Sequence, residues 1–207
     1  MFLRGLRTSA VLRRASKDGG VLAAIRAELA HELSSAPSSP PSLASEDAPG
    51  FATVSDAPQA QDVLLRRRTD SEEVLVSALL APLQFVDQEP LRREALMKVF
   101  VTKPGATPVL HFDCRASLVG DGGGLADYAI NAVRYHSSPG ADGEDKYEGP
   151  EFRELDPRLQ AALHHYLVAR GINSNLASSI LHHLLQKERT QYVIWLKTLE
   201  ERFAKDN

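Results

Sequence analysis

The spacing of apolar residues changes near residue 150, and this change constrains the fold more than any other feature. Between residues 51 and 137, short segments rich in Val, Leu, Phe and Tyr are separated by turn-forming stretches such as TDS, KPGATP and VGDGGG. Short apolar segments at this spacing are typical of strands joined by antiparallel connections. Beyond residue 150, apolar residues recur every three or four positions, as in amphipathic helices. Strands followed by helices predict an α+β fold with segregated layers.

The strand pattern is clearest between residues 109 and 114, where the residue types alternate. Successive side chains of a strand point to opposite faces of a sheet. One face of this strand would carry Leu110, Phe112 and Cys114. The other face would be polar and would carry Val109, His111 and Asp113. We therefore expect a sheet that is covered on one face only.

Three helical segments are expected after the sheet. Asp156 can cap the first, Pro157 suits its first helical position, and Gly171 ends it. Asn173 or Ser174 can cap the second segment. The third segment, roughly residues 187–203, has one apolar face and one charged face. We expect that apolar face to serve helix or subunit packing, and it consists of Tyr192, Trp195, Leu196, Leu199 and Phe203.

The N-terminus has the composition of a mitochondrial transit peptide. Residues 1–17 contain five basic side chains, and no acidic residue precedes Asp18. An amphipathic, Arg-rich segment without acidic residues is typical of mitochondrial import signals. The alternative is a solvated basic tail. Cleavage near Ala15 would remove four arginines and take the formal charge from −3 to −7. A moderately acidic mature protein is a poor candidate for nonspecific binding to nucleic acid.

These patterns divide the chain into six parts. They are a mitochondrial transit peptide (1–16), an N-terminal helix (17–34), a Pro/Ser-rich linker (35–50), an antiparallel sheet (51–137), an acidic loop (138–151) and C-terminal helices (152–207). Residues 17–207 are expected to form one domain, because this length suits a single core. The longest apolar runs are too short to span a bilayer.

Few residues carry recognisable chemistry. Cys114 is the single cysteine, which excludes an internal disulfide and a multi-cysteine metal site. It would need a nearby histidine to act as a nucleophile, and a small core residue is the better interpretation. The histidines at 164–165 and 182–183 are adjacent pairs, which do not form an i, i+4 metal clamp. We expect no enzyme activity, no cofactor, no metal and no small-molecule substrate.

Two charged clusters remain as candidate binding residues. Alternation along a strand would send Arg66 and Arg68 to one side and Arg67 to the other. Together with Arg92 and Arg93, they are candidate contacts for RNA or an acidic partner. The alternative is a solvated sheet edge that resists aggregation. The candidate acidic cluster lies in the loop and consists of Asp142, Glu144, Asp145 and Glu148.

Two runs near the C-terminus resemble the mitochondrial acidic matrix protein family, also called the mitochondrial glycoprotein family. The family run L-D-x-x-L-Q-x-A-x-H-x-Y-L-x-x-R-G-I is matched from Leu155 to Ile172. A second run, Y-x-x-W-L-K-x-L, is matched from Tyr192 to Leu199. The segment from Leu110 to Cys114 is similar to the family's L-x-x-D-C strand.

The resemblance implies a twisted antiparallel sheet of about seven strands, flanked by N- and C-terminal helices. It also implies a homotrimeric ring in the mitochondrial matrix and a binding protein without established enzymatic activity. Family members are linked to mitochondrial translation, ribosome biogenesis and oxidative phosphorylation. The acidic loop of this chain is short for the family, which favours a dedicated docking role over general capture of basic ligands.

Two functions from different classes follow as hypotheses. The first is a matrix protein that supports mitochondrial translation by docking to ribosomal proteins, rRNA or assembly intermediates of the mitochondrial ribosome. The alternative is an acidic, chaperone-like scaffold for basic matrix proteins that supports oxidative phosphorylation. An enzyme that uses Cys114 or the histidines is only a formal third possibility. In a trimer, we expect the ring of Trp195 to be buried.

Overall fold

The computed structural model describes residues 19–35, 50–87, 89–90, 93–119, 126–136 and 147–205. The expected transit peptide and almost all of the expected linker lie outside these residues. The contacts divide the chain into two compact units, Pro41–Leu185 and a second made of Met1–Pro40 with Gln186–Asn207. The expectation that residues 17–207 form one domain stays a prediction.

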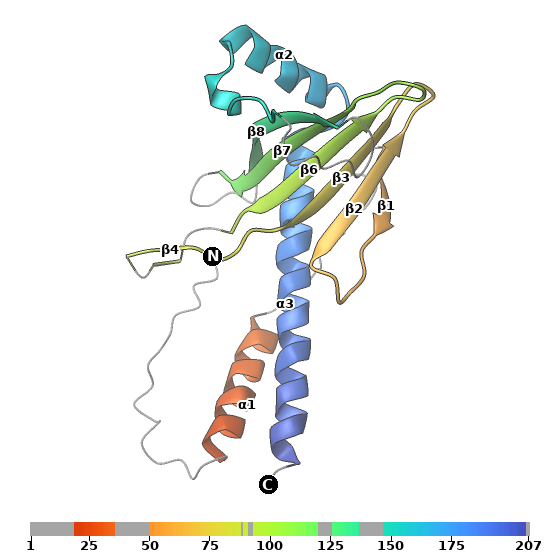
Figure 1. Cartoon of the computed structure of the whole chain (residues 1–207). Coiled ribbons are helices and arrows are strands. Elements are labelled where there is room, and N and C mark those ends of the chain that lie inside the picture. Colours follow the sequence, from red (N-terminus) through yellow and green to blue (C-terminus); the bar gives the residue numbers. More distant parts are fainter. Residues whose placement is uncertain are drawn as a thin grey trace. The chain divides into compact units, whose positions relative to one another are not determined.

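The unit Pro41–Leu185 is built on an antiparallel sheet of six strands (Figure 1). The spatial order is β1-β2-β3-β6-β7-β8, so the strands of this sheet are arranged in chain order, with β4 and β5 inserted between β3 and β6. The six strands are β1 (Ala52–Ser55), β2 (Asp62–Arg68), β3 (Glu73–Leu80), β6 (Ala95–Thr102), β7 (Val109–Leu118) and β8 (Ala126–His136). A separate hairpin pairs β4 (Phe85–Val86) with β5 (Glu89–Pro90). The α+β class is confirmed, and the sheet has six strands where about seven were expected.

Alternation along the strands places the core on one face of the sheet. Val63, Val76 and Val99 are fully buried on β2, β3 and β6, while their chain neighbours are more exposed. The same core includes Phe112 and Cys114, as the sequence predicted. We call the opposite side the outer face. It carries the alternate residues of each strand, among them Leu64, Arg66, Leu75, Lys98, Phe100, Asp113 and Arg115.

The prediction that the outer face is polar and uncovered was wrong at two positions. His111 is 5% exposed and Val109 is 7% exposed. The ring of Phe100 on β6 stacks on His111, and His136 on β8 lies beside it. Side chains from neighbouring strands therefore cover His111 on the outer face.

The first C-terminal helix begins and ends where the sequence predicted. It is α2 (Pro157–Val168), and the side chain of Asp156 accepts a hydrogen bond of 2.8 Å from the backbone N–H of Arg158. Gly171 has a φ of +83°, a left-handed conformation that favours glycine. The N–H of Ile172 donates to the carbonyl of Leu167 at 3.1 Å, which closes a Schellman-type end. Leu167 and Ile172 are both fully buried.

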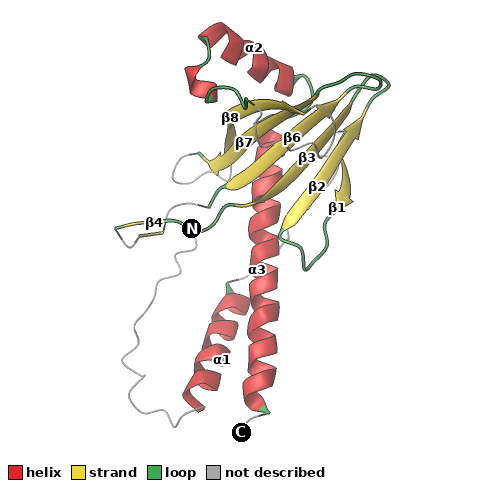
Figure 2. Cartoon of the chain, viewed as in Figure 1, coloured by secondary structure: helices red, strands yellow, loops and turns green. Residues whose placement is uncertain are grey.

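The second and third predicted helices are one helix, so their separation was wrong. It is α3 (Ser174–Ala204), which starts with Asn173 accepting a 3.0 Å hydrogen bond from the N–H of Leu176. No glycine or proline lies between residues 174 and 204, and nothing local interrupts the helix. Leu176, Ile180, Leu181 and Leu184 are buried against the core of the sheet. Figure 2 shows α3 as one continuous helix.

The second compact unit is a helix pair. The helix α1 (Gly19–Ser34) agrees with the predicted 17–34 segment and lies beside the C-terminal part of α3 (Figure 1). Arg26 pairs with Glu200 at 2.8 Å, and the hydroxyl of Tyr192 donates to Glu28 at 3.1 Å. Ile25 and Leu196 are its most buried apolar residues, at 8% and 3% exposure. Among the described helices, none is long and apolar enough to cross a membrane.

Candidate functional site

The three consecutive arginines of β2 divide between the two faces of the sheet, as alternation predicted. Arg67 follows the buried residues Val63 and Leu65 on the core face. A Cβ added at Gly171 would lie 2.7 Å from Nη1 of Arg67, so this guanidinium is packed against the end of α2. Arg66 and Arg68 point to the outer face, where Arg68 pairs with Glu73. Arg66 and Arg68 can therefore meet a partner on that face, whereas Arg67 has a packing role.

The structure does not place the other predicted basic residues beside these arginines. Arg66 pairs in register with Leu75, near one end of β3. Arg93 precedes Ala95, which pairs with Leu80 at the other end of β3. Leu75 and Leu80 are five residues apart along β3, which corresponds to roughly 17 Å at about 3.3 Å per residue. Arg92 lies outside the described residues.

The predicted acidic loop is represented by one of its four candidate residues. Glu148 accepts a 2.9 Å hydrogen bond from Nε of Arg134 on β8, and its side chain is 69% exposed. Asp142, Glu144 and Asp145 lie outside the described residues. The described end of the acidic loop is therefore attached to the outer face of the sheet through Arg134.

The predicted packing residues of α3 differ in exposure within the helix pair. Leu196 is buried, while Tyr192, Leu199 and Phe203 are half-buried. Trp195 is 55% exposed, and its ring stacks on Tyr192 with centroids 5.8 Å apart. The Trp195 ring is therefore not buried within a single chain. Its burial in a trimer stays a prediction.

Cys114 has the environment of a core residue. Its side chain is buried on the core face of β7. Burial raises the pKa of the Cys114 thiol to about 12. A thiol of this kind is protonated at neutral pH and is a weak nucleophile.

We expect Cys114 to react slowly with a thiol reagent until the protein unfolds. At about pH 8 a thiol with a pKa of about 12 is roughly 0.01% thiolate, against about a quarter for an unperturbed cysteine. The reaction with Ellman's reagent should therefore be at least about 1000-fold slower in native protein than in concentrated guanidinium chloride. Native and denatured rates within tenfold of each other would contradict this environment.

Apart from Glu148, the residues with the most connected chemistry were missed by the sequence analysis, and they lie on the outer face of β7 and β8. Nδ1 of His111 lies 3.0 Å from Nε2 of His136, and Nε2 of His111 lies 3.1 Å from Asp113. Asp113 also contacts the guanidinium of Arg134. We call His111, Asp113, Arg134, His136 and Glu148 the outer polar cluster. The alternation at 109–114 predicted that His111 and Asp113 share one face of β7. The register between β7 and β8 was needed to show that Arg134 and His136 lie beside them.

The adjacent histidine pairs on α2 and α3 have separate partners. His164 stacks on Tyr128 of β8, with ring centroids 5.4 Å apart. His183 lies 2.8 Å from the carboxylate of Asp56. In the part of the chain that the structure describes, no three His, Cys, Asp or Glu side chains gather as metal ligands.

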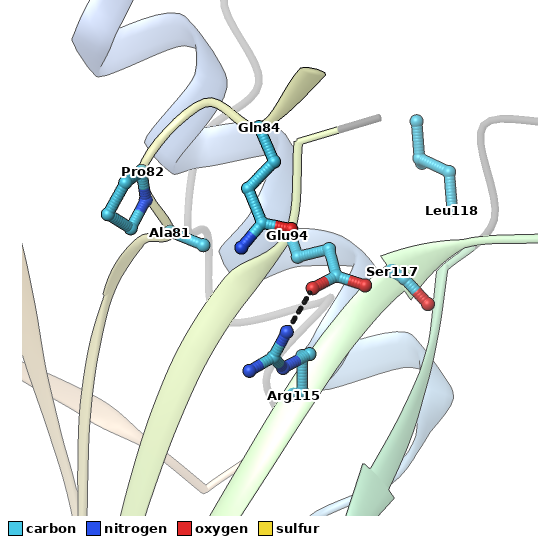
Figure 3. A pocket seen from close by; sticks show the side chains of 7 residues that line it. All are labelled: Ala81, Pro82, Gln84, Glu94, Arg115, Ser117 and Leu118. Atoms are coloured by element: carbon cyan, nitrogen blue, oxygen red, sulfur yellow. Dashed lines mark hydrogen bonds and ion pairs between the residues drawn. The ribbon is translucent and has the colours of Figure 1, made fainter. Parts of the chain in front are cut away.

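A shallow hollow of about 450 Å³ opens at the other end of the outer face (Figure 3). Its polar side chains include Glu94 and Arg115, which pair at 2.9 Å. The two charged side chains of the hollow are therefore paired with each other. The lining residues are Ala81, Pro82, Gln84, Glu94, Arg115, Ser117 and Leu118.

Comparisons with known proteins agree with the fold and with the C-terminal sequence runs. The model of the mitochondrial glycoprotein family, MAM33, matches residues 84–203. The chain is 43% identical over 56 residues to the mitochondrial acidic protein mam33 of Schizosaccharomyces pombe, a stretch covering 27% of this chain and 21% of that protein. It is 26% identical over 158 residues to the uncharacterized mitochondrial protein At2g39795 of Arabidopsis thaliana, covering 72% of this chain and 60% of that one. The match thus spans about a fifth of the length of the yeast protein and three fifths of the length of the plant protein.

Two solved structures share the fold. The crystal structure of the Trypanosoma brucei p22 protein aligns with a TM-score of 0.68 and 22% identity, covering 91% of this chain and all of that one. A Leishmania major protein of unknown function, described as a sequence homologue of human p32, aligns with a TM-score of 0.67 and 20% identity, covering 91% and 99% of the two chains. With the family match over more than half of its length, the chain belongs to the mitochondrial glycoprotein family.

Proposed function

We propose that this protein is a non-enzymatic binding protein of the mitochondrial matrix that supports mitochondrial translation. It would dock on the mitochondrial ribosome or on its assembly intermediates. The observation that carries the proposal is the outer face of the sheet, whose ion pairs Arg68–Glu73, Arg115–Glu94 and Arg134–Glu148 are partly exposed. Exposed ion pairs contribute little to folding, and their charges can instead contact a charged partner. Family membership supports the mitochondrial location.

We also propose that the protein assembles as a homotrimer through the helix pair. Ile194 and Trp195 are large apolar residues that are 52% and 55% exposed on adjacent positions of α3. Leu33 of α1 is 52% exposed as well. Contact with other copies of the chain would remove this apolar area from water, which is the main driving force of association.

The test of docking is density-gradient sedimentation of a tagged copy in a matrix extract, at low and at high salt. The natural sequence should travel with a ribosomal subunit. Arg66→Ser combined with Arg68→Ser should move most of the protein toward the top of the gradient, because both side chains face outward from β2. Arg67 is left intact because it packs beside Gly171.

The matched control is Arg153→Ser with Arg158→Ser, which removes one exposed arginine from the 3-10 helix Phe152–Glu154 and one from the first turn of α2, with the same change in net charge. The control should sediment like the natural sequence. Equal loss in both variants would show that total charge, and not the outer face, controls docking. If the natural sequence stays near the top at both salt concentrations, the ribosome proposal is wrong.

The acidic scaffold makes a different prediction in the same extract. Replacing Asp142, Glu144, Asp145 and Glu148 with their amides should abolish capture of basic matrix proteins, while the Arg66 and Arg68 variant should retain it. The exposed side chain of Glu148 supports keeping this alternative. This pattern of results would replace docking on the ribosome as the function.

A further inference from the structure

A buried histidine and a half-buried one close one end of the ladder between β7 and β8. His111 is 5% exposed, and its Nδ1 lies 3.0 Å from Nε2 of His136. The ring of His111 stacks on Phe100 of β6, with centroids 4.4 Å apart and planes inclined by 20°. His136 is the last residue of β8 and pairs in register with Val109, the first residue of β7. The contact between the two rings therefore joins the ends of two strands.

Charged side chains surround this pair on the outer face. Asp113 lies 3.1 Å from Nε2 of His111 and contacts Arg134 through its other oxygen. Nε of Arg134 donates to Glu148 at 2.9 Å. Lys98 of β6 pairs in register with Asp113 and is exposed to solvent. A chain of contacts thus runs from the histidine pair through β8 to the segment at residues 147–150.

The geometry limits the pair to one extra proton. The carboxylate beside Nε2 of His111 favours an N–H at that nitrogen over a lone pair. The 3.0 Å contact then requires one N–H and one lone pair between Nδ1 of His111 and Nε2 of His136. The neutral pair meets this requirement when Nε2–H of His136 donates to Nδ1 of His111, and one added proton is also compatible with it, because either ring can then donate to the other. A second added proton would place two N–H groups against each other.

The charge balance points the same way. The negative charges around the pair are those of Asp113, which lies beside His111, and of Glu148, and both carboxylates already contact Arg134. A second proton places a further positive charge beside a ring that is 5% exposed. Lys98 from β6 adds to the repulsion, since it lies next to Asp113 in register. A charge buried without a partner is strongly destabilising.

We propose that the histidine pair is a proton-sensitive latch, which holds the end of the β7–β8 ladder closed while it carries at most one added proton and opens when it takes up a second. Opening separates His136 from His111 and removes His136 from its place beside Val109. Arg134 lies two residues before His136 on β8, so opening also disturbs its contact with Glu148. Acidification would therefore change how Glu148 is held on the outer face. This inference does not depend on the proposed function.

The test is hydrogen exchange measured by mass spectrometry on the full chain, following the peptide that covers β8. Between about pH 7.5 and pH 5, imidazoles take up protons. After correction for the intrinsic pH dependence of exchange, protection of the C-terminal part of β8 should fall by about tenfold or more in the natural sequence. In His136→Gln it should change by less than about twofold, because the amide can donate to Nδ1 of His111 but cannot take up a proton. Equal losses in both proteins, or no loss in either, would overturn the latch.

The matched control is His165→Gln, which changes an exposed histidine on α2 and should leave the pH response intact. If His136→Gln fails to fold, the ¹⁵N signals of the histidine rings in the natural sequence decide. The signals of His111 and His136 should change together on uptake of the first proton, and the second should coincide with the loss of protection. Independent titration of the two rings without loss of protection would contradict the proposal.

Discussion

Replacing Phe112 with alanine should lower the free energy of unfolding by about 3–5 kcal/mol. The side chain of Phe112 is fully buried in the core of the sheet. Its ring stacks on Tyr166 of α2, with centroids 5.9 Å apart. Alanine would leave a cavity where α2 packs on the sheet, and a close-packed core cannot collapse completely around it. Urea denaturation followed by circular dichroism measures the change as a shift of the midpoint.

Phe85→Ala is the matched control for this prediction. It removes the same atoms from a side chain that is 58% exposed on β4. Surface substitutions of this kind usually change stability by less than about 0.5 kcal/mol. A loss of less than about 1 kcal/mol in Phe112→Ala would mean that α2 does not pack on β7 in solution.

Replacing Arg170 with alanine should cost roughly 3 kcal/mol, the lower end of the range for breaking a buried ion pair. Nη2 of Arg170 lies 2.8 Å from Glu72 in the turn between β2 and β3, and each side chain is 15% exposed. The guanidinium also lies 3.4 Å above the ring of Tyr166 and donates to the carbonyl of that residue at 2.9 Å. Alanine would leave the carboxylate of Glu72 mostly buried without a cation.

A double-mutant cycle separates the ion pair from the other contacts of Arg170. The variants are Arg170→Ala, Glu72→Ala and the two together, each measured by urea denaturation. Contacting residues of this kind show interaction energies of about 0.5–3 kcal/mol. Arg153→Ala is the control, because its pair with Glu151 is exposed and contributes at most about 1 kcal/mol. Additive losses at Arg170 and Glu72 would show that the two side chains do not interact in solution.

Burial raises the pKa of Tyr166 above its ordinary value, with Arg170 opposing and Glu72 adding to the shift. The ring therefore stays protonated and apolar through the physiological range. This agrees with its place between Phe112 and the guanidinium of Arg170. The family run through Tyr166, Arg170 and Gly171 thus corresponds to one packing site that attaches α2 to the sheet.

The features predicted correctly depend on residues close together in the chain. Asp156 caps α2 through an N–H two residues away, and Gly171 ends it through its own backbone conformation. The opposite directions of Arg66 and Arg67 follow from strand alternation alone. The split of α3 into two helices was wrong although the necessary information was local, because the sequence from 174 to 204 contains no helix-breaking residue.

The candidate site could be predicted only in part, because its members are distant in sequence. His111 and His136 are separated by 25 residues and meet through the register of β7 and β8. Glu72 and Arg170 are 98 residues apart. Arg66 and Arg93 lie at opposite ends of β3, which is visible only once that strand is paired with β2 and β6.

By itself, the sequence determined the α+β class, the caps of α2, the buried side of the strands and the resemblance to a mitochondrial family. These properties come from hydrogen bonds and side-chain periodicity within a few residues of each other. Only the tertiary structure decided which polar side chains share a surface, that His111 is buried, and that Arg67 packs beside Gly171. Those outcomes depend on strand register and on the docking of helices, which are set by packing between segments far apart in the chain.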